Sequence, residues 1–428
     1  MGCLRAETRR AVYGRALSID AFTVFFTVLI CVLAIATIFM AVDYLPTTDV
    51  IGGEYYPLIM FAVVGAIFMA AATDLIVLFL ALETMSMAAY VLAGAWKRNP
   101  RSNEAALKYF LLGAFASGFM LYGIALLYGA AGSTSYAVLA EAARRNASEP
   151  LLLGGAAMLL VGLGFKVAAV PFHLWTPDVY EGAPTSVTAF MATVVKAAAF
   201  AALVRVVVVA LAPVAVQLQW ILWAGAAMTM TVGNVVALQQ SSLKRMLAYS
   251  SIAHTGYLLV GVTAGGADGG AAVLYYLTVY AAMNLGAFGV MMMLARRGDG
   301  AERIADLAGL AQQNPMLAVA MTVCMLSLTG IPPFGGFFGK LYLFTAALER
   351  GYVALVVIAV LNSVLSAAYY LGVVRAMYFE SGGLDARPRG YLAVATAAAV
   401  VATIALGLAA NPVIRTAGAA LSGPLLGP

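Results

Sequence analysis

The stretch Gly162-Leu-Gly-Phe-Lys-Val-Ala-Ala-Val-Pro171 places a lysine inside an apolar segment that glycine and proline interrupt. Proline cannot donate a backbone hydrogen bond and glycine loosens a helix, so the segment predicts a helix that breaks beside Lys166. The stretch Gly330-Ile-Pro-Pro-Phe-Gly-Gly-Phe-Phe-Gly-Lys340 has the same features. Backbone groups freed inside a membrane must face protein or a water-filled cavity. Both stretches therefore predict discontinuous membrane helices with a lysine beside the break.

The composition of the whole chain is that of a membrane protein. Of its 428 residues 63% are hydrophobic and 10% are charged, and the mean hydropathy is +0.95. A soluble domain carries roughly 25% charged residues. Apolar runs of about 20 residues, enough to cross a hydrocarbon core of ~30 Å, recur along the chain. These runs are continuous rather than alternating, which excludes an outer-membrane barrel. We expect an all-α polytopic transmembrane bundle of about twelve helices.

Hydropathy predicts spans at residues 20–43, 56–73, 74–96, 106–131, 150–171, 185–212, 217–238, 244–264, 271–295, 315–346, 352–379 and 390–410. Two sets of five follow one another, each with its broken element fourth, and an odd number inverts the second set in the membrane. The predicted division is a basic N-terminal tail (1–19), an N-terminal helix and loop (20–55), two inverted five-helix repeats (56–212 and 217–379), and a C-terminal helix and tail (390–428).

Basic residues in alternate loops predict the orientation of the chain. One side carries Lys97, Arg98, Arg101, Lys244, Arg245, Arg296, Arg297, Arg303, Arg387 and Arg389, and the other carries Arg144, Arg145, Arg350 and Arg415. The positive-inside rule assigns the first side to the cytoplasm. It leaves the tail with Arg5, Arg9, Arg10 and Arg15 outside, against the rule. The net charge of +5 is therefore interpreted as topology information, and no nucleic-acid partner is expected.

Cysteines and histidines are too few and too scattered for a redox or metal centre. Cys3, Cys31 and Cys324 are isolated in the sequence, so they form neither a disulfide framework nor a CxxC site. With two histidines, bis-histidine haem ligation and multi-histidine metal sites are disfavoured. We expect no cofactor in this chain.

Five ionisable residues fall inside the predicted spans: Glu83, Lys166, Lys196, Lys340 and His254. An ionised group at the bilayer centre costs about 2.5 to 3.5 kcal/mol even on insertion scales, so each needs a partner, a wet cavity or a neutral form. A buried Glu–Lys pair that opens and closes can exchange protons near neutral pH. We predict a proton relay in which Glu83 controls the charge on Lys166, Lys196 passes the proton on, and His254 and Lys340 complete the exit.

Structural roles are the alternative for these and other polar residues. His254 could simply hydrogen-bond across helices. Four cations near span ends are expected to be structural and to extend to the headgroups: Lys108, Arg205, Lys244 and Arg375. His173 with Asp178 and Glu181 suggests a metal site, but a hydrogen-bonded plug under the broken helix is the favoured interpretation.

Long strings in this sequence resemble one family. They are Gly162–Pro184 followed by Phe190-Met-Ala-Thr-Val-Val-Lys196, Glu104–Gly113, Leu243–His254 and Met325–Lys340. The chain resembles the subunit N family of bacterial type I NADH:quinone oxidoreductase (respiratory complex I) from about Leu17 to its end. Members usually have fourteen helices, so the resemblance implies that the first two are absent here. A chain that starts at the third helix would begin outside.

The resemblance implies a proton-translocating, antiporter-like subunit of the membrane arm in the bacterial cytoplasmic (inner) membrane. It implies pumping roles for Glu83, Lys166, Lys196 and Lys340. NADH, FMN, iron–sulfur clusters and quinone would belong to other subunits. The implied partners are sister antiporter-like subunits, small membrane subunits and the lipid bilayer. The alternatives are a cation/proton antiporter subunit, hydrogenase-linked or stand-alone, and a structural membrane scaffold.

Overall fold

Polar caps and long apolar runs define the helices of this chain, whose computed structural model describes residues 10–48, 50, 53–294, 303–382 and 390–422. Asp20 accepts a hydrogen bond from the backbone N–H of Thr23 at the start of α1 (Ala21–Tyr44). Asp74 caps α3 (Leu75–Ala93) in the same way. Such side chains satisfy backbone donors that have no partner in the first helical turn. They fix where the apolar helices begin.

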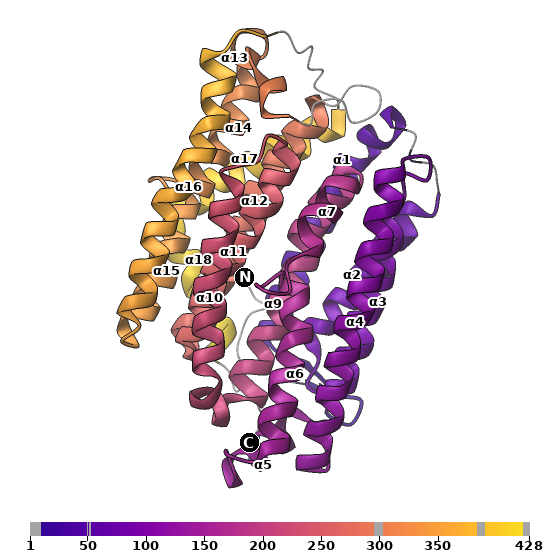
Figure 1. Cartoon of the computed structure of the whole chain (residues 1–428), viewed down its shortest axis with the longest axis vertical. Coiled ribbons are helices and arrows are strands. Elements are labelled where there is room, and N and C mark those ends of the chain that lie inside the picture. The colour runs from indigo at the N-terminus through magenta and orange to yellow at the C-terminus, as the bar shows by residue number, and fades with distance from the viewer. Residues whose placement is uncertain (1–9, 49, 51–52, 295–302, 383–389, 423–428) are drawn as a thin grey trace.

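One flank of the bundle consists of α2 (Tyr55–Ala71), α3, α4 (Pro100–Ala131) and α6 (Pro150–Val167) (Figure 1). Small residues let these helices pack closely. A Cβ at Gly65 of α2 would lie 2.6 Å from the backbone nitrogen of Met85 in α3. A Cβ at Gly123 of α4 would lie 2.7 Å from the backbone nitrogen of Leu159 in α6. Close backbone approach at small residues is a usual means of helix association in membranes.

The opposite flank contains α14 (Pro315–Thr329), α15 (Gly335–Glu349) and α16 (Val353–Phe379) (Figure 1). Next to it lie α10 (Ala215–Ala237), α17 (Gly390–Leu408) and α18 (Ala410–Ser422). α17 packs on both α12 (Gly266–Leu294) and α1. The last membrane helix of the chain thus contacts the first.

The centre of the bundle is one nearly continuous helical segment together with α11 (Leu243–Ala264) and α12. The segment consists of α8 (Thr185–Phe190), the π-helical η2 (Met191–Val195), α9 (Lys196–Arg205) and the π-helical η3 (Val206–Ala210). In the apolar windows of 185–210 and of α12, 94% of the residues are buried within the chain. Polar side chains on these helices therefore need partners from the protein itself.

Both predicted helix breaks are present. α6 ends at Val167, and α7 (Trp175–Gly182) begins after a seven-residue connection. α14 ends at Thr329 and α15 begins at Gly335. Lys166 precedes its break, at the end of α6, whereas Lys340 follows its break, in the second turn of α15. The two lysines are thus mounted on opposite halves of their broken helices.

Each of the twelve predicted spans is helical, and nine helices of the described residues are long and apolar enough to cross a membrane. α4 starts at Pro100, six residues before the predicted boundary, because Asn99 caps it there. Elements outside the predicted spans include α5 (Tyr136–Arg145), α13 (Leu310–Gln313), α18 and the short 3-10 helices η1 (Leu45–Thr47), η4 (Ala212–Val214) and η5 (Ile304–Leu307). The division into two repeats stays a prediction.

Short β-bridges join loops to one another at each end of the helix bundle. Part of the predicted tail forms a hairpin of β1 (Arg10–Val12) and β2 (Leu17–Ile19), in which Arg10 pairs with Ile19. Leu17 also pairs with Ala72, and Asp74 pairs with Ser135. A separate bridge joins Ser242 to Arg303, whose loops were assigned to the opposite side. Six of the basic residues used for the orientation lie outside the described residues: Arg5, Arg9, Arg296, Arg297, Arg387 and Arg389.

Candidate functional site

Lys166 lies where α6 gives way to irregular backbone. The helix closes at Ala168, whose φ of 63° is left-handed, and Pro171 then prevents its continuation. The indole N–H of Trp175 donates to the carbonyl of Phe165 over 2.9 Å, and the N–H of Val170 donates to Thr229 Oγ1 over 2.9 Å. Side chains of α7 and α10 thus satisfy backbone groups around the break. The carbonyl end of α6 also favours a positive charge in its last turn.

Aromatic side chains surround the Lys166 ammonium. Lys166 is 3% exposed, and its Nζ donates to the Tyr90 hydroxyl over 3.1 Å. The nitrogen lies 5.0 Å from the ring centre of Tyr90, 5.4 Å from that of Tyr109 and 5.5 Å from that of Phe165. Rings at these distances attract a cation through their negative faces. Among the described residues, no carboxylate lies within ion-pair distance of this ammonium.

Glu83 lies on the side of α3 that faces out of the bundle. It is half-buried, and the Ser117 hydroxyl of α4 donates to its Oε1. Leu80 and Met87, on the same helix face, are 58% and 51% exposed. Tyr90, the hydrogen-bond partner of Lys166, follows Glu83 by two helical turns, which is about 10 Å along the axis. Glu83 and Lys166, the predicted pair, are therefore not in direct contact in the structure, and Lys166 hydrogen-bonds Tyr90 instead.

Lys196 begins α9 in the buried centre, and its Nζ lies 5.3 Å from the ring centre of Tyr280. Within the described residues its hydrogen-bond partners are all hydroxyl or carbonyl oxygens. Its Nζ donates to the Ser251 carbonyl over 2.7 Å, to the Ser251 hydroxyl, and to Thr255 Oγ1 over 2.9 Å. Thr255 Oγ1 in turn lies 2.6 Å from the carbonyl oxygen of Val167, the residue after Lys166. One threonine hydroxyl thus joins Lys196 to the break of α6.

His254 lies one turn beyond Ser251 on α11 and is fully enclosed. Its Nδ1 shares a hydrogen bond of 2.6 Å with the Tyr276 hydroxyl, and its Nε2 shares one of 3.0 Å with the Tyr370 hydroxyl. Tyr370 also hydrogen-bonds Ser250. The predicted cross-helix hydrogen bonds of His254 are therefore present. They also place a titratable ring in a continuous set of hydroxyl groups.

Lys340 bonds to the end of the helix that precedes its own. Its Nζ donates to the carbonyl oxygens of Leu328 (3.2 Å) and Thr329 (2.8 Å) at the end of α14. It also donates to the Ser363 hydroxyl over 2.9 Å and lies 4.7 Å from the ring centre of Tyr257. The break frees these carbonyls, and a cation at a helix C-terminus is electrostatically favoured.

Helix α11 contacts both Lys196, the central lysine, and Lys340, the lysine of the second broken helix. Ser251 and Thr255 bind Lys196, and Tyr257 lies under Lys340, so consecutive turns of one helix contact both cations. The ring centres of His254 and Tyr257 are 5.6 Å apart. The sequence predicted roles for the lysines and His254 but none for Ser251, Thr255 or Tyr257. The hydroxyl side chains of Ser251 and Thr255, four residues apart inside an apolar span and so on one helix face, were the available signal.

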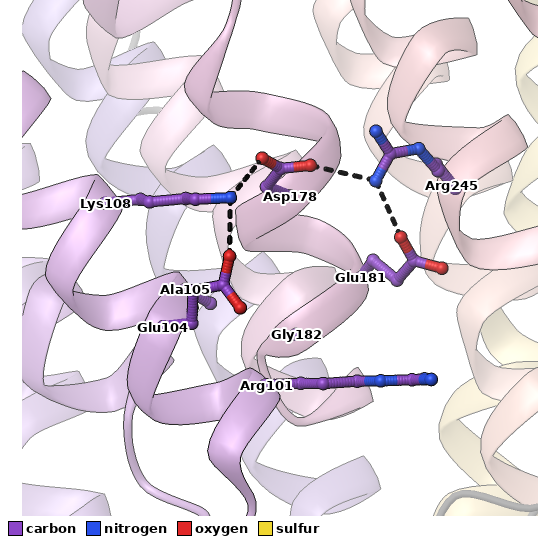
Figure 2. Close-up of a pocket in the computed structure, with 8 residues that line it drawn as sticks. All are labelled: Arg101, Glu104, Ala105, Lys108, Asp178, Glu181, Gly182 and Arg245. Atoms are coloured by element: carbon purple, nitrogen blue, oxygen red, sulfur yellow. Dashed lines mark hydrogen bonds and ion pairs between the residues drawn. The ribbon is translucent and has the colours of Figure 1, made fainter.

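A second polar cluster lies where α4, α7 and α11 meet (Figure 2). Lys108 forms ion pairs with Glu104 (2.7 Å) and Asp178 (2.8 Å). Arg245 forms ion pairs with Asp178 (2.9 Å) and Glu181 (2.7 Å). Asp178 is shared by both cations. Asp178 and Glu181, which the sequence offered either to a metal site or to a hydrogen-bonded plug, are thus both held by ion pairs to cations of α4 and α11.

Two of the four cations predicted to extend to the headgroups are instead buried. Arg205 is 1% exposed and binds both carboxylate oxygens of Asp20 over 2.8 Å each. Lys244 is 1% exposed and donates to the Ala183 carbonyl over 2.6 Å. The headgroup prediction is wrong for both, because a buried carboxylate and a helix C-terminus compete for these cations. Arg375, which pairs with Glu380 over 3.2 Å, has a side chain that is 74% exposed.

Comparisons with known proteins agree on one family. A family model described as "NADH:quinone oxidoreductase/Mrp antiporter, TM" matches residues 72–366. The NADH-quinone oxidoreductase subunit N of Trichlorobacter lovleyi is 48% identical over 372 residues, 86% of this chain and 76% of that protein. A chain of respiratory complex I from Thermus thermophilus, solved with bound aureothin, is 38% identical, with a TM-score of 0.81 over 95% of this chain and 88% of that chain. A chain of the Mrp complex from Dietzia sp. is 25% identical, with a TM-score of 0.83 over 95% and 83% of the two chains.

Proposed function

This chain belongs to the NADH:quinone oxidoreductase/Mrp antiporter family as a subunit N of NADH-quinone oxidoreductase, and from that membership we propose that Glu83, Lys166, Lys196, His254 and Lys340 are its proton relay. The enzyme of which it is a subunit is an H⁺-translocating oxidoreductase. The chain itself is a multi-pass membrane protein. Its proposed task is to move protons across the membrane while electrons pass from NADH to quinone in other subunits.

The observation that supports this relay most strongly is a set of three buried lysines that have no carboxylate partner among the described residues. Lys166, Lys196 and Lys340 are 3 to 4% exposed, and within the described residues their Nζ atoms donate hydrogen bonds only to hydroxyl and carbonyl oxygens. A helix bundle that needed these residues only for packing would leave three desolvated charges uncompensated, at several kcal/mol each. Neutral oxygens suit a lysine that is protonated part of the time, because they accept from the ammonium and hydroxyls can donate to the amine.

Mutual repulsion couples the protonation of neighbouring lysines in the proposed relay. Two ammonium groups in a low-dielectric interior repel each other strongly, so a proton that arrives on Lys166 favours the loss of a proton already held by Lys196. The hydroxyl of Thr255 lies between the backbone at Lys166 and the Lys196 amine. His254 and its two tyrosine partners then continue the set of exchangeable protons toward Lys340. Where two of these groups are not in direct contact, the proposed transfer runs through water between them.

The exposed face around Glu83 is the proposed contact with a neighbouring membrane-arm subunit. A carboxylate near the middle of a membrane helix cannot face lipid at low cost. Glu83 is half-buried within its own chain, and the apolar side chains beside it are exposed. A partner subunit that covers this face would shield Glu83 and set its charge. Sister antiporter-like or small membrane subunits are the proposed partners, and the electron carriers are proposed to belong to other subunits.

The proposal is tested with Glu83→Gln in the complete complex reconstituted into proteoliposomes. Tyr90, which contacts Lys166, lies about 10 Å along α3 from Glu83. Across that distance, at an effective dielectric constant of about 20, a unit charge contributes roughly 1.7 kcal/mol, which corresponds to about tenfold in a rate. We expect the rate of proton pumping driven by NADH to fall by a similar factor. Pumping is followed by a pH-sensitive dye, and NADH oxidation by absorbance in parallel.

Glu83→Asp, which keeps the charge, is the matched variant and should retain most of the pumping. Unchanged pumping in Glu83→Gln, with an unchanged ratio of protons to NADH, would refute the relay as drawn. The structural likeness to the Mrp chain makes a cation/proton antiporter subunit the second candidate. That function predicts pumping that requires Na⁺ or K⁺ gradients and persists without NADH. We expect neither.

Gly330→Ala is expected to disturb Lys340 specifically. Gly330 has a φ of +92°, and a Cβ there would lie 3.0 Å from Cδ and 3.4 Å from Nζ of Lys340. Gly351 has a φ of +83° with nothing within 4 Å of its Cβ position, so Gly351→Ala has the same backbone strain without the contact. That strain costs about 1 to 2 kcal/mol in either variant. We expect severalfold slower pumping only in Gly330→Ala. Equal pumping in the two variants would show that Lys340 placement is unimportant.

A further inference from the structure

The ion-pair cluster of α4, α7 and α11 surrounds a pocket of about 280 Å³ that the buried relay does not include. Its lining is mostly charged and consists of Arg101, Glu104, Ala105, Lys108, Asp178, Glu181, Gly182 and Arg245. In Figure 2 the Lys108 ammonium points between two carboxylates, and the Arg245 guanidinium does the same on the other side of Asp178. The pocket is therefore polar and large enough for several water molecules.

This pocket lies near the membrane surface that the loop charges assign to the cytoplasm. α4 has 32 residues, about 48 Å in length, which exceeds the ~30 Å hydrocarbon core by several turns. Lys108 is eight residues from the start of α4, which is about 12 Å along its axis. The cluster is thus at the depth where the hydrocarbon begins.

A short aromatic and hydroxyl segment separates the pocket from Lys166. Tyr109 follows Lys108 directly, stacks on Trp175 with ring centres 4.4 Å apart, and lies under the Lys166 ammonium. Thr176 lies two residues before Asp178. The hydroxyls of Tyr109 and Thr176 are both buried and have no hydrogen-bond partner within the described residues. Buried hydroxyls are normally satisfied, so this segment is a place where ordered water would bind.

The pairing pattern lets Asp178 change its charge at little cost. Lys108 has a second carboxylate, Glu104, and Arg245 has a second carboxylate, Glu181. If Asp178 takes up a proton, both cations therefore keep an ion-pair partner. Protonation of Glu104 or Glu181 would instead leave Asp178 as the sole carboxylate for one cation while it also serves the other. Asp178 is the member of the cluster that can be neutralised without leaving a cation alone.

Building on the relay proposed above, we propose that Asp178 is the carboxylate at which protons from cytoplasmic water enter the path to Lys166. In this step the Asp178 carboxylate accepts a proton from pocket water. It then releases that proton, through water at the Tyr109 and Thr176 hydroxyls, to the neutral Lys166 amine. Asp178 returns to the carboxylate form and re-forms both ion pairs. Charge and protons balance, because one proton enters and one is passed on.

The groups that face Asp178 set its pH response. They are Arg101, Glu104 and Lys108 from α4, Glu181 from its own helix, and Arg245 from α11. The cations favour the carboxylate form, so Asp178 is a weak acceptor at high pH and depends on rapid exchange with the pocket. Without Asp178, protons must reach Lys166 directly from bulk water, and that supply falls as pH rises.

Asp178→Asn in the intact reconstituted complex tests this inference, with the cytoplasmic face outward and the outer pH varied. We expect pumping about tenfold slower than wild type near pH 8 and recovery toward the wild-type rate near pH 6, where water supplies more protons. Asp178→Glu should restore pumping across this range. Glu380→Gln removes an exposed carboxylate that pairs with Arg375 away from the pocket, and it should behave as wild type.

A second variant distinguishes a loss of proton entry from a loss of folding or assembly. Lys108→Gln with Asp178→Asn removes one charge of each sign, so assembly should be preserved if charge balance is what holds α7 in place. It should show the same pH-dependent loss. Wild-type pumping across the pH range in Asp178→Asn would overturn the entry role and leave the relay intact, provided that Lys196→Met still abolishes pumping. If Lys196→Met also pumps normally, the proposed function itself fails.

Discussion

In complex assembled with Lys196→Met, proton pumping driven by NADH should fall to the background leak of the vesicles, at least about a hundredfold below wild type. Methionine fills the same space but carries no proton, and positioned acid–base groups typically contribute a factor of about 10² to 10⁴. Lys196 bonds to Ser251 and Thr255, and Thr255 reaches the backbone beside Lys166. Tyr280 also hydrogen-bonds Ser251, but within the described residues no second lysine, arginine, histidine or carboxylate hydrogen-bonds Ser251 or Thr255. Proteoliposomes with a pH-sensitive dye measure the effect.

Lys97→Met is the control for this substitution. Lys97 is exposed outside the spans and pairs with Glu54 over 2.9 Å, so its loss should leave pumping unchanged. We expect both variants to assemble. Native electrophoresis checks this, because it reports the presence of the complex independently of pumping. A structural scaffold, the remaining alternative, predicts intact pumping in Lys196→Met. Assembly with normal pumping would support the scaffold and exclude the relay.

Much of the site could be predicted from the sequence because membrane spans restrict charge so strongly. Each residue of the predicted relay is costly in hydrocarbon, so its presence alone indicated a function. Proline and glycine beside Lys166 and Lys340 indicated both breaks for a local reason, the loss of backbone donors and of helix rigidity. Neither inference required knowledge of which helices contact each other. In the structure α6 ends at Val167 and α14 ends at Thr329, next to the proline and glycine residues of the two breaks.

Contacts between distant helices could not be predicted in this way. Arg205 is 185 residues from Asp20, and hydropathy near a span end favoured the headgroups for it. Thr255 is a small hydroxyl residue of a kind that usually bonds to its own helix, and only the packing of α11 on the α6 break gives it a second partner. The sharing of Asp178 by α4 and α11 likewise depends on where α7 docks.

The placement of the two broken-helix lysines illustrates the same limit. Both were assigned to helix breaks, but Lys166 is held by aromatic rings before its break, and Lys340 is held by freed carbonyls after its break. A ring-lined ammonium depends on precise ring positions, since cation–π attraction falls off beyond about 6 Å. A carbonyl-bound ammonium depends on the helix end beneath it. Different glycine substitutions should therefore impair the two lysines.

Gly113→Ala is accordingly expected to slow NADH-driven pumping by about ten- to a hundredfold. A Cβ at Gly113 of α4 would lie 2.0 Å from the Tyr90 hydroxyl oxygen and 2.7 Å from the adjoining ring carbon, so the ring must move. Its hydroxyl is the hydrogen-bond partner of Lys166. A hydrogen bond to a charged group contributes about 1.5 to 3 kcal/mol, which corresponds to the expected range of rates. Pumping and NADH oxidation are recorded on the same vesicles.

Gly129→Ala is the matched control, because Gly129 lies on the same helix and nothing lies within 4 Å of its Cβ position. Alanine also has the higher helix propensity, so neither change should weaken α4 itself. Tyr90→Phe removes the hydroxyl without moving the ring and separates the two contributions. It should slow pumping less than Gly113→Ala does, since the ring still lies beside the ammonium. If Gly113→Ala and Gly129→Ala pump equally well, Tyr90 does not position Lys166, and the proton must reach Lys196 by a path that avoids the break of α6.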